Sequence, residues 1–263
     1  MRRAATALAL VVWLAACAST PESDVLPPDE QFARAEQRYE DGDFRQAIAD
    51  FQTFSFNYPQ DPRVPEARWK TADGYYQVED WATAAQEYFN YQRDYPRDER
   101  AAEALFQAGR AYQQMSLRPE LDQRDTERAV NAYDRVIVEY PRSEFVEEAR
   151  SRKAELRDKL AEKVYLNAEF YFDNENYPAT VLYLTDLIEL YTDTAWIPAA
   201  YALLARAQCE QGLGERASEV HARLREDYPE SSAAREVLAE LPERCRATSA
   251  ASDGEAPGPT GGR

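Results

Sequence analysis

The feature that most constrains the fold of this chain is a short stop signal, Tyr-Pro, that recurs at the end of apolar, helix-like segments. Four copies read NYPQD, DYPRD, EYPRS and DYPES, and a fifth, LYTDT, has Thr192 in place of the proline. Proline has no amide hydrogen with which to continue a helix, and it disfavours helical geometry in the residue before it. Each copy therefore predicts the end of a helix.

The spacing of these stops indicates a structural repeat, because other residue types keep the same register. The stops lie at positions 59, 96, 141, 192 and 229. The spacings between successive stops are therefore 37, 45, 51 and 37 residues. Twelve positions before each stop lies a small residue or threonine: Ala47, Ala84, Ala129, Thr180 and Ala217. Eight positions before lies a ring or its substitute: Phe51, Tyr88, Tyr133, Leu184 and His221. Small residues also recur every 37 positions at Ala35, Ala72 and Gly109. This pattern is typical of tetratricopeptide units, which are helix pairs of about 34 residues.

The sequence therefore predicts an all-α fold, a tetratricopeptide-repeat superhelix of five helix pairs over residues 29–241. A single helix pair cannot bury its apolar face, so the units must stack on one another. The expected pairs are 30–41 with 43–57, 64–78 with 80–94, 99–115 with 124–139, 144–174 with 176–191, and 195–211 with 213–227. A capping helix is expected near 231–240. A generic helical bundle is the alternative, which the shared register disfavours.

Two insertions interrupt the period. The third unit is 45 − 37 = 8 residues longer, within 116–125, and the fourth is 51 − 37 = 14 residues longer. The extra length of the fourth unit predicts a first helix of about 30 residues, roughly 45 Å long. This helix carries a run of basic residues, at Arg150, Arg152, Lys153, Arg157, Lys159 and Lys163. Either they form a solvated face with pairs such as Glu148 with Arg152, or the first four form a docking ridge.

The N-terminus predicts export and a lipid anchor. Two arginines precede an apolar run, residues 4–16, that is shorter than the roughly 20 residues needed to span a bilayer, so residues 1–16 are expected to be a signal peptide. The segment LAAC resembles the bacterial lipoprotein signal, which makes Cys17 the lipidated first residue of the mature protein. The alternative is an ordinary signal peptide with an incidental cysteine. Ala18 favours the outer membrane, facing the periplasm, and residues 17–28 are expected to form a flexible tether.

Composition excludes several classes of function. The chain has 31 basic and 48 acidic residues, a formal net charge of −17, which repels nucleic acid and anionic lipid head groups. It has no G-x-S-x-G, no H-E-x-x-H, no phosphate-binding glycine loop and no zinc-type cysteine pairs. We therefore expect no enzyme, no metal, no catalytic residue and no cofactor beyond the lipid on Cys17. His221, the single histidine, is expected to pack, and residues 242–263 are expected to be a disordered tail.

The two remaining cysteines, Cys209 and Cys245, are predicted to form a disulfide. An exported chain meets conditions in which disulfides form. A capping helix roughly parallel to the first helix of the fifth unit would bring both cysteines to the same end. The alternative is two free thiols.

Aromatic residues in the first helices suggest a peptide groove in units one to three. Phe32, Trp69 and Phe106 stand one 37-residue step apart, as do Tyr39, Tyr76 and Gln113, and Glu36, Asp73 and Arg110. The hypothesis is that an extended peptide binds Phe32, Tyr39, Trp69, Asp73, Tyr76, Phe106 and Arg110. The alternative is that the rings only pack between neighbouring first helices, because core packing requires the same spacing.

Over residues 17–241 the chain resembles the BamD-like lipoproteins of the outer-membrane β-barrel assembly machinery. The resemblance rests on LAAC, on YEDGDFRQAIADFQTFSFNYP, on NENYPATVLYLTDLIELYTDT and above all on the segment from DTERAVNAYDRVIVEYPRSEF to LAEKVYLNAEFYF. It departs at Thr192 and in the tail. It implies a scaffold without enzymatic activity that binds the POTRA domains of an Omp85-type barrel insertase, other assembly lipoproteins and unfolded outer-membrane proteins. A different periplasmic repeat adaptor, serving envelope constriction or peptidoglycan synthesis, is the alternative. A muramidase with a helical scaffold is disfavoured because no catalytic domain remains.

Overall fold

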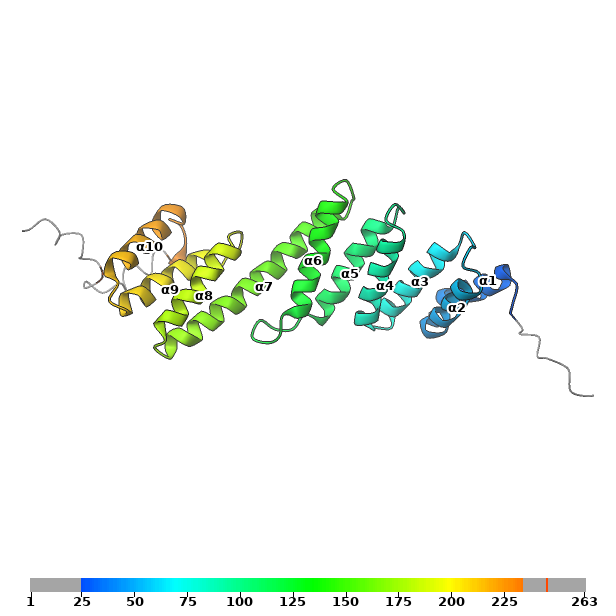
Figure 1. Ribbon diagram of the computed structural model, residues 1–263, viewed down its shortest axis with the longest axis horizontal. Helices are drawn as coiled ribbons and strands as arrows, with labels where there is room; N and C mark the ends of the chain where they lie inside the picture. The colour runs from blue at the N-terminus through cyan, green and yellow to red at the C-terminus, as the bar shows by residue number, and fades with distance from the viewer. Residues whose placement is uncertain (1–24, 234–244, 246–263) are drawn as a thin grey trace, which may run out of the picture. The chain divides into compact units, whose positions relative to one another are not determined.

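The computed structural model describes residues 25–233 and Cys245. Within them it contains α-helices and no strand (Figure 1). The helices are α1 (Pro28–Glu40), α2 (Phe44–Asn57), α3 (Val64–Gln77), α4 (Trp81–Asp94), α5 (Ala101–Met115), α6 (Arg124–Glu139), α7 (Val146–Asp173), α8 (Tyr177–Leu190), α9 (Ile197–Glu210) and α10 (Gly214–Asp227). Each predicted repeat helix is present, with ends within two residues of the expected ones. The all-α tetratricopeptide fold is confirmed.

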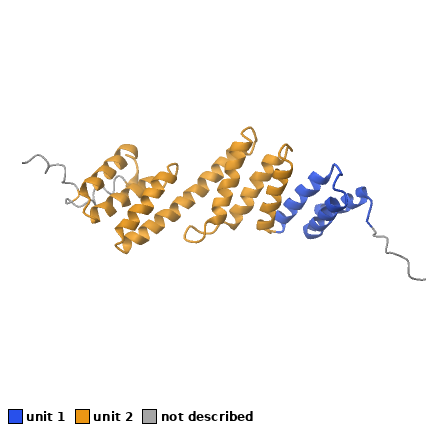
Figure 2. Ribbon diagram, in the orientation of Figure 1, with its two compact units in different colours: residues 1–78 blue, residues 79–263 orange. Residues whose placement is uncertain are grey.

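Some predicted segments lie outside the described residues. These are the signal peptide 1–16, Cys17, most of the tether 17–28, most of the capping helix 231–240, and the tail 242–263 apart from Cys245. The described chain divides into two compact units, residues 1–78 with α1 to α3 and residues 79–263 with α4 to α10 (Figure 2).

The stop signals form one kind of turn, and the turn explains why Thr192 can replace proline. In every copy the tyrosine is the residue after the helix, with φ between −134° and −123° and ψ between 41° and 59°. The carbonyl of each tyrosine accepts a hydrogen bond from the amide three residues on, at 2.9–3.1 Å. That third residue is Asp, Ser or Thr in all five copies, and Asp61 and Asp98 also accept the amide two residues further on at 2.9 Å. The tyrosine and this polar residue thus shape the turn with or without proline.

The turn within a pair uses left-handed backbone in every pair except the third, where the insertion replaces it. Gly42 between α1 and α2 has φ of 79°, and Glu175 between α7 and α8 has φ of 59°. The amides of Glu175 and Asn176 donate hydrogen bonds to the carbonyls of Phe172 and Tyr171, respectively, at 2.9 Å each. Glycine adopts this conformation without steric cost, whereas glutamate is strained there.

The repeat positions form the core. All five small positions, from Ala47 to Ala217, are fully buried, and so are the first four ring positions, from Phe51 to Leu184. At Gly109 a β-carbon would lie 2.7 Å from the Tyr133 ring, so this close approach of α5 and α6 requires glycine. The small residues therefore let the helices approach, and the rings fill the space between them.

Candidate docking surfaces

Phe32, the first residue of the aromatic row Phe32, Trp69 and Phe106, belongs to the hydrophobic core. Phe32 is 6% exposed and meets the rings of Phe51 and Phe54 edge-on, with centroids 5.7 and 5.1 Å apart. The guanidinium of Arg63 lies 5.1 Å from the centre of the Phe32 ring, and Arg63 also pairs with Asp29 at 3.0 Å. Packing therefore accounts for Phe32, and its ring does not line an open groove.

The other candidate residues of the first compact unit form a half-buried polar and aromatic cluster across α1 and α3. The Tyr39 hydroxyl donates to Asp73, and burial, followed by that carboxylate, raises the pKa of Tyr39 well above its usual range. The Lys70 ammonium lies 3.3 Å from Glu36 and 5.0 Å from the centre of the Tyr39 ring. Trp69 and Tyr76 lie on α3 and are partly exposed. This face could meet a ligand through partly exposed rings and alternating charges.

The members of the rows on α5 pack inside the second compact unit. Phe106 is 3% exposed and stacks on Phe145, with ring centroids 5.1 Å apart. Gln113 accepts a hydrogen bond from the Tyr133 hydroxyl at 2.8 Å, and Arg110 donates to Gln107 at 3.1 Å. Phe106 therefore does not line an open groove. Because the rows extend over two separately described units, a continuous groove stays a prediction.

Most residues of the predicted docking ridge on α7 bind other residues of the second compact unit. The Arg157 guanidinium binds Asp193 at 2.6–3.0 Å and the Leu190 carbonyl at 2.8 Å. Lys153 pairs with Asp134 of α6, and Arg152 binds Glu148 at 2.7 Å. Only Arg150, whose side chain is 58% exposed with Glu147 at 3.6 Å, resembles an outward-facing charge. Arg157 and Lys153 therefore fasten α7 to its neighbours, whereas Arg152 and Arg150 form ion pairs within the helix. A ridge made of all four stays a prediction.

The remaining two basic residues of α7 hold the third-unit insertion, which we call the insertion loop (residues 116–123). Lys163 Nζ donates to the carbonyls of Leu121 and Pro119 at 2.7 and 3.3 Å, and Lys159 Nζ donates to Ser116 Oγ at 2.8 Å. The part of α7 that exceeds an ordinary repeat helix thus holds the extra residues of the preceding unit. Period counting found both insertions, but the sequence held no signal that they touch.

Gln123 organises the insertion loop from within. Its side chain is buried, and Nε2 donates to the carbonyls of Arg118 and Leu121 at 2.7 and 3.3 Å. Its Oε1 accepts the Thr126 hydroxyl at 2.7 Å, and that hydroxyl lies 2.5 Å from Ser116 Oγ. The loop therefore presents a defined surface, on which Leu117 and Leu121 remain 48% and 45% exposed.

An apolar surface on α7 and α8 was not anticipated from the sequence. Phe170 of α7 and Leu182 of α8 are 63% and 61% exposed, and the rings of their chain neighbours Tyr171 and Tyr183 stack with centroids 5.3 Å apart. The Phe170 ring lies 5.5 Å from that of Tyr171. We call these four residues the α7–α8 patch. Exposed apolar side chains beside partly exposed aromatic rings are characteristic of protein interaction sites.

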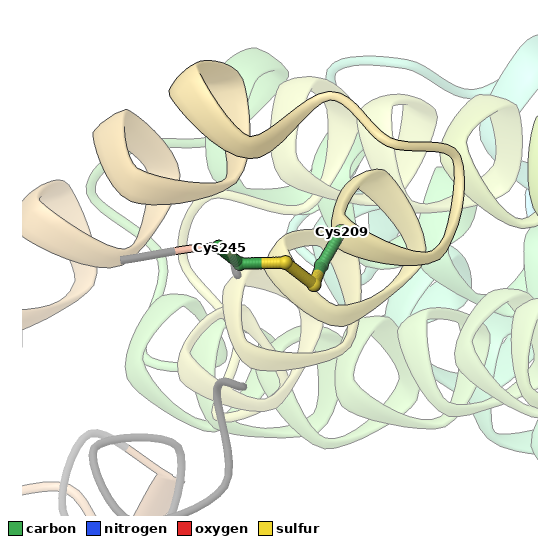
Figure 3. The surroundings of a disulfide bond; sticks show 2 residues. All are labelled: Cys209 and Cys245. Atoms are coloured by element: carbon green, nitrogen blue, oxygen red, sulfur yellow. A yellow bond between two sulfur atoms is a disulfide. The ribbon is translucent and has the colours of Figure 1, made fainter. Parts of the chain in front are cut away.

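The predicted cysteine pair is joined in the structure. A disulfide connects Cys209 of α9 to Cys245, with Cα atoms 5.8 Å apart (Figure 3). Both cysteines are buried in the apolar cluster of the fifth unit, which includes Leu203 and Leu224. The bond links the end of the first helix of that unit to a residue beyond the last described helix.

No group of three or more His, Cys, Asp and Glu that could hold a metal occurs in residues 25–233. His221 lies partly buried on α10, at the ring position of the fifth unit. None of the helices in the described part of the chain is both long and apolar enough to cross a membrane.

The chain is similar to known proteins in both sequence and structure. A family model described as an outer membrane lipoprotein, YfiO, matches residues 25–224. A tetratricopeptide protein from Parabacteroides merdae is 14% identical with a TM-score of 0.38, over 83% of this chain and 89% of that one. PilW, a type IV pilus biogenesis factor, is 14% identical with a TM-score of 0.35, over 80% and 98%. The TPR2AB domain of yeast Sti1 is 17% identical with a TM-score of 0.39, over 79% and 80%.

Proposed function

Because the chain belongs to the YfiO family of outer membrane lipoproteins, we propose that it is a lipid-anchored scaffold of the machinery that assembles outer-membrane β-barrels. The family match over residues 25–224 carries this proposal. The fold supports it, since stacked helix pairs are built for protein recognition over extended surfaces. Both the family and the fold are scaffold types, and we infer that the chain is not an enzyme.

The proposed anchor is a lipid on Cys17, which would hold the repeats at the periplasmic face of the outer membrane. The segment LAAC supports this assignment, with its preceding arginines and apolar run. One acyl chain alone binds a membrane only marginally, so stable anchoring calls for more than one chain.

The proposed partner at the α7–α8 patch is the POTRA region of an Omp85-type barrel insertase. Exposed Phe170 and Leu182 and the stacked tyrosines supply the rigid aromatic surface that interface centres favour. Arg150 lies earlier on α7, about 30 Å from Phe170 along the helix, so it would contribute through a separate contact. The other ridge residues would act indirectly, because Arg157 and Lys153 fix α7 against the adjoining turn and α6. Other assembly lipoproteins are further proposed partners.

Unfolded outer-membrane proteins are the proposed clients of the first compact unit. Partly exposed Trp69 and Tyr76, with the Tyr39–Asp73 pair beside Lys70, would contact an extended peptide. Phe32 would support this face from the core. A photoreactive peptide with a barrel-type aromatic C-terminus should label Trp69 or Tyr76, and labelling confined to exposed Phe56 on α2 would count against the client site.

A mild-detergent pull-down from native membranes tests the scaffold proposal, with mass spectrometry to identify what is recovered. The wild-type chain should recover an Omp85-type barrel with POTRA domains. The double variant Phe170→Asp with Leu182→Asp should lose it, whereas the matched control Phe56→Asp with Val138→Asp, at positions 84% and 69% exposed, should keep it. Recovery of peptidoglycan synthases or division proteins without a barrel would instead support the alternative adaptor.

A further inference from the structure

We propose that a groove beside the insertion loop is a docking site for a protein segment that carries apolar side chains next to arginine or lysine. The groove has a volume of about 550 Å³ and lies between the insertion loop, the start of α6, α7 and the residue after α8. It lies wholly within the second compact unit.

The floor of the groove is apolar. It is formed by Leu160 and Val164 of α7, by Tyr191 after α8, and by Leu121 of the loop. Leu160 is 7% exposed, whereas Leu121 is 45% exposed. Leu117 lies outside the groove on the same loop and is a second exposed apolar side chain there. Exposed apolar side chains both in the groove and elsewhere on the loop suit several residues of a chain better than one small molecule.

The charged groups at the rim of the groove that are not already paired within residues 25–233 are acidic. Asp122 pairs with Arg124 at 3.0 Å, and the Lys163 ammonium is directed at the loop carbonyls. The carboxylates of Glu120 and Glu127 have no ion-pair or hydrogen-bond partner among the described residues. Glu127 is close enough to Tyr191 that its charge, after burial, helps to raise the pKa of that phenol. Both carboxylates therefore stand beside the apolar floor.

These two properties specify the occupant. Leucine, valine or aromatic side chains would bury Leu121 and the accessible part of the floor, and arginine or lysine beside them would pair with Glu120 and Glu127. The net charge of −17 would also favour the approach of a basic segment. An acidic or neutral polar segment gains neither contact. The loop is already held by Gln123, Lys159 and Lys163, so little conformational entropy is lost when a segment binds.

This docking site does not require a role in barrel assembly, because it follows from the chemistry of the groove alone. The test uses the full chain purified from membranes in detergent, and fluorescein-labelled peptides read by fluorescence anisotropy. The probe is a seven-residue peptide, Gly-Arg-Leu-Arg-Leu-Arg-Gly. One matched peptide replaces arginine with glutamate and another replaces leucine with serine. The probe should bind, and both matched peptides should bind at least about tenfold more weakly.

Two variants locate the site. Glu120→Gln with Glu127→Gln should weaken probe binding about three- to tenfold, because the variant loses two exposed charge pairs, each of which contributes modestly. The control Glu215→Gln with Glu226→Gln on α10 makes the same change in net charge and should leave binding unchanged. Leu121→Ser should also weaken binding while it leaves the backbone carbonyl for Lys163 in place.

Several results would overturn the inference. The first is no probe binding up to 1 mM, and the second is equal binding of the glutamate or serine peptide. The third is an equal loss in the two glutamine doubles, which would mean attraction by net charge alone. Unchanged binding by Leu121→Ser would also refute the apolar floor as a contact. Circular dichroism of each variant distinguishes these results from loss of fold.

Discussion

Arg157 on α7 binds the carboxylate of Asp193, 36 residues further along the chain, through both Nε and Nη2 of its guanidinium. The Arg157 side chain is 22% exposed, and its charge also lies 5.3 Å from the centre of the Tyr191 ring. A residue that sequence alone offered as a docking charge thus fastens the long helix to the turn that follows α8.

Replacing this arginine should therefore cost stability. Arg157→Ala should lower the free energy of unfolding by about 1–2 kcal/mol, less than a buried charged hydrogen bond because Asp193 is half exposed. Arg150→Ala, at a more exposed arginine of the same helix, is the control and should change it by less than about 0.5 kcal/mol. Urea unfolding followed by circular dichroism measures both. Equal effects of the two variants would contradict the structural role.

The same pair predicts a pH dependence. The hydrogen bond from Arg157 lowers the pKa of Asp193 below its ordinary value of 3.8. A carboxylate with a lowered folded pKa stabilises the folded state above its unfolded pKa, and this contribution is lost as pH falls through the folded value. The stability difference between wild type and Asp193→Asn should therefore be constant from pH 7 to about 5 and shrink below pH 3.8. A difference that grows on acidification would refute the assignment.

Gly109 should tolerate no side chain while Tyr133 faces it. Gly109→Ala should lower the free energy of unfolding by about 1–3 kcal/mol, because the new β-carbon would meet the tyrosine ring, and alanine's better helix propensity offsets only part of this. A double-mutant cycle with Tyr133→Leu, the residue type found at the same repeat position in unit four, should show favourable coupling. Additive effects of the two substitutions would show that the close approach is not the cause.

The disulfide should stabilise the fifth unit. Cys209→Ser with Cys245→Ser should lower the free energy of unfolding by about 2–4 kcal/mol, because the bond closes a loop with a sequence separation of 36 residues. Reductant should lower the melting temperature of the wild type and leave that of the double variant unchanged. A wild type that is insensitive to reductant would show that the bond is absent or contributes nothing.

The helices could be predicted because their signals are local. Tyrosine, proline and a following Asp, Ser or Thr determine where the second helix of each pair ends, and the burial of Ala84, Ala129 and Thr180 follows from the register that these stops define. Even the irregular copy at Thr192 keeps the turn. The lengths of both insertions also followed from counting between stops.

The surfaces could not be predicted, because side-chain partners lie far apart in sequence. Phe32 and Phe106 recur with the 37-residue repeat period. Core residues and groove residues both follow this period, so the spacing alone does not distinguish them. Lys163 binds the carbonyl of a residue 42 positions earlier, and no local pattern encodes that contact. Phe170 and Leu182 carried no polar signal, so their exposure became evident only from the packing of α7 and α8.

The most direct measurement of the central claim is depletion of this chain from its native cells, with outer-membrane barrel proteins followed by their heat-modifiable mobility. If the chain is an assembly scaffold, folded barrels should fall within a few generations while other lipoproteins stay constant. Wild type should restore them, and Phe170→Asp with Leu182→Asp should not. Normal barrel levels on depletion, with a defect confined to peptidoglycan or division, would contradict the account.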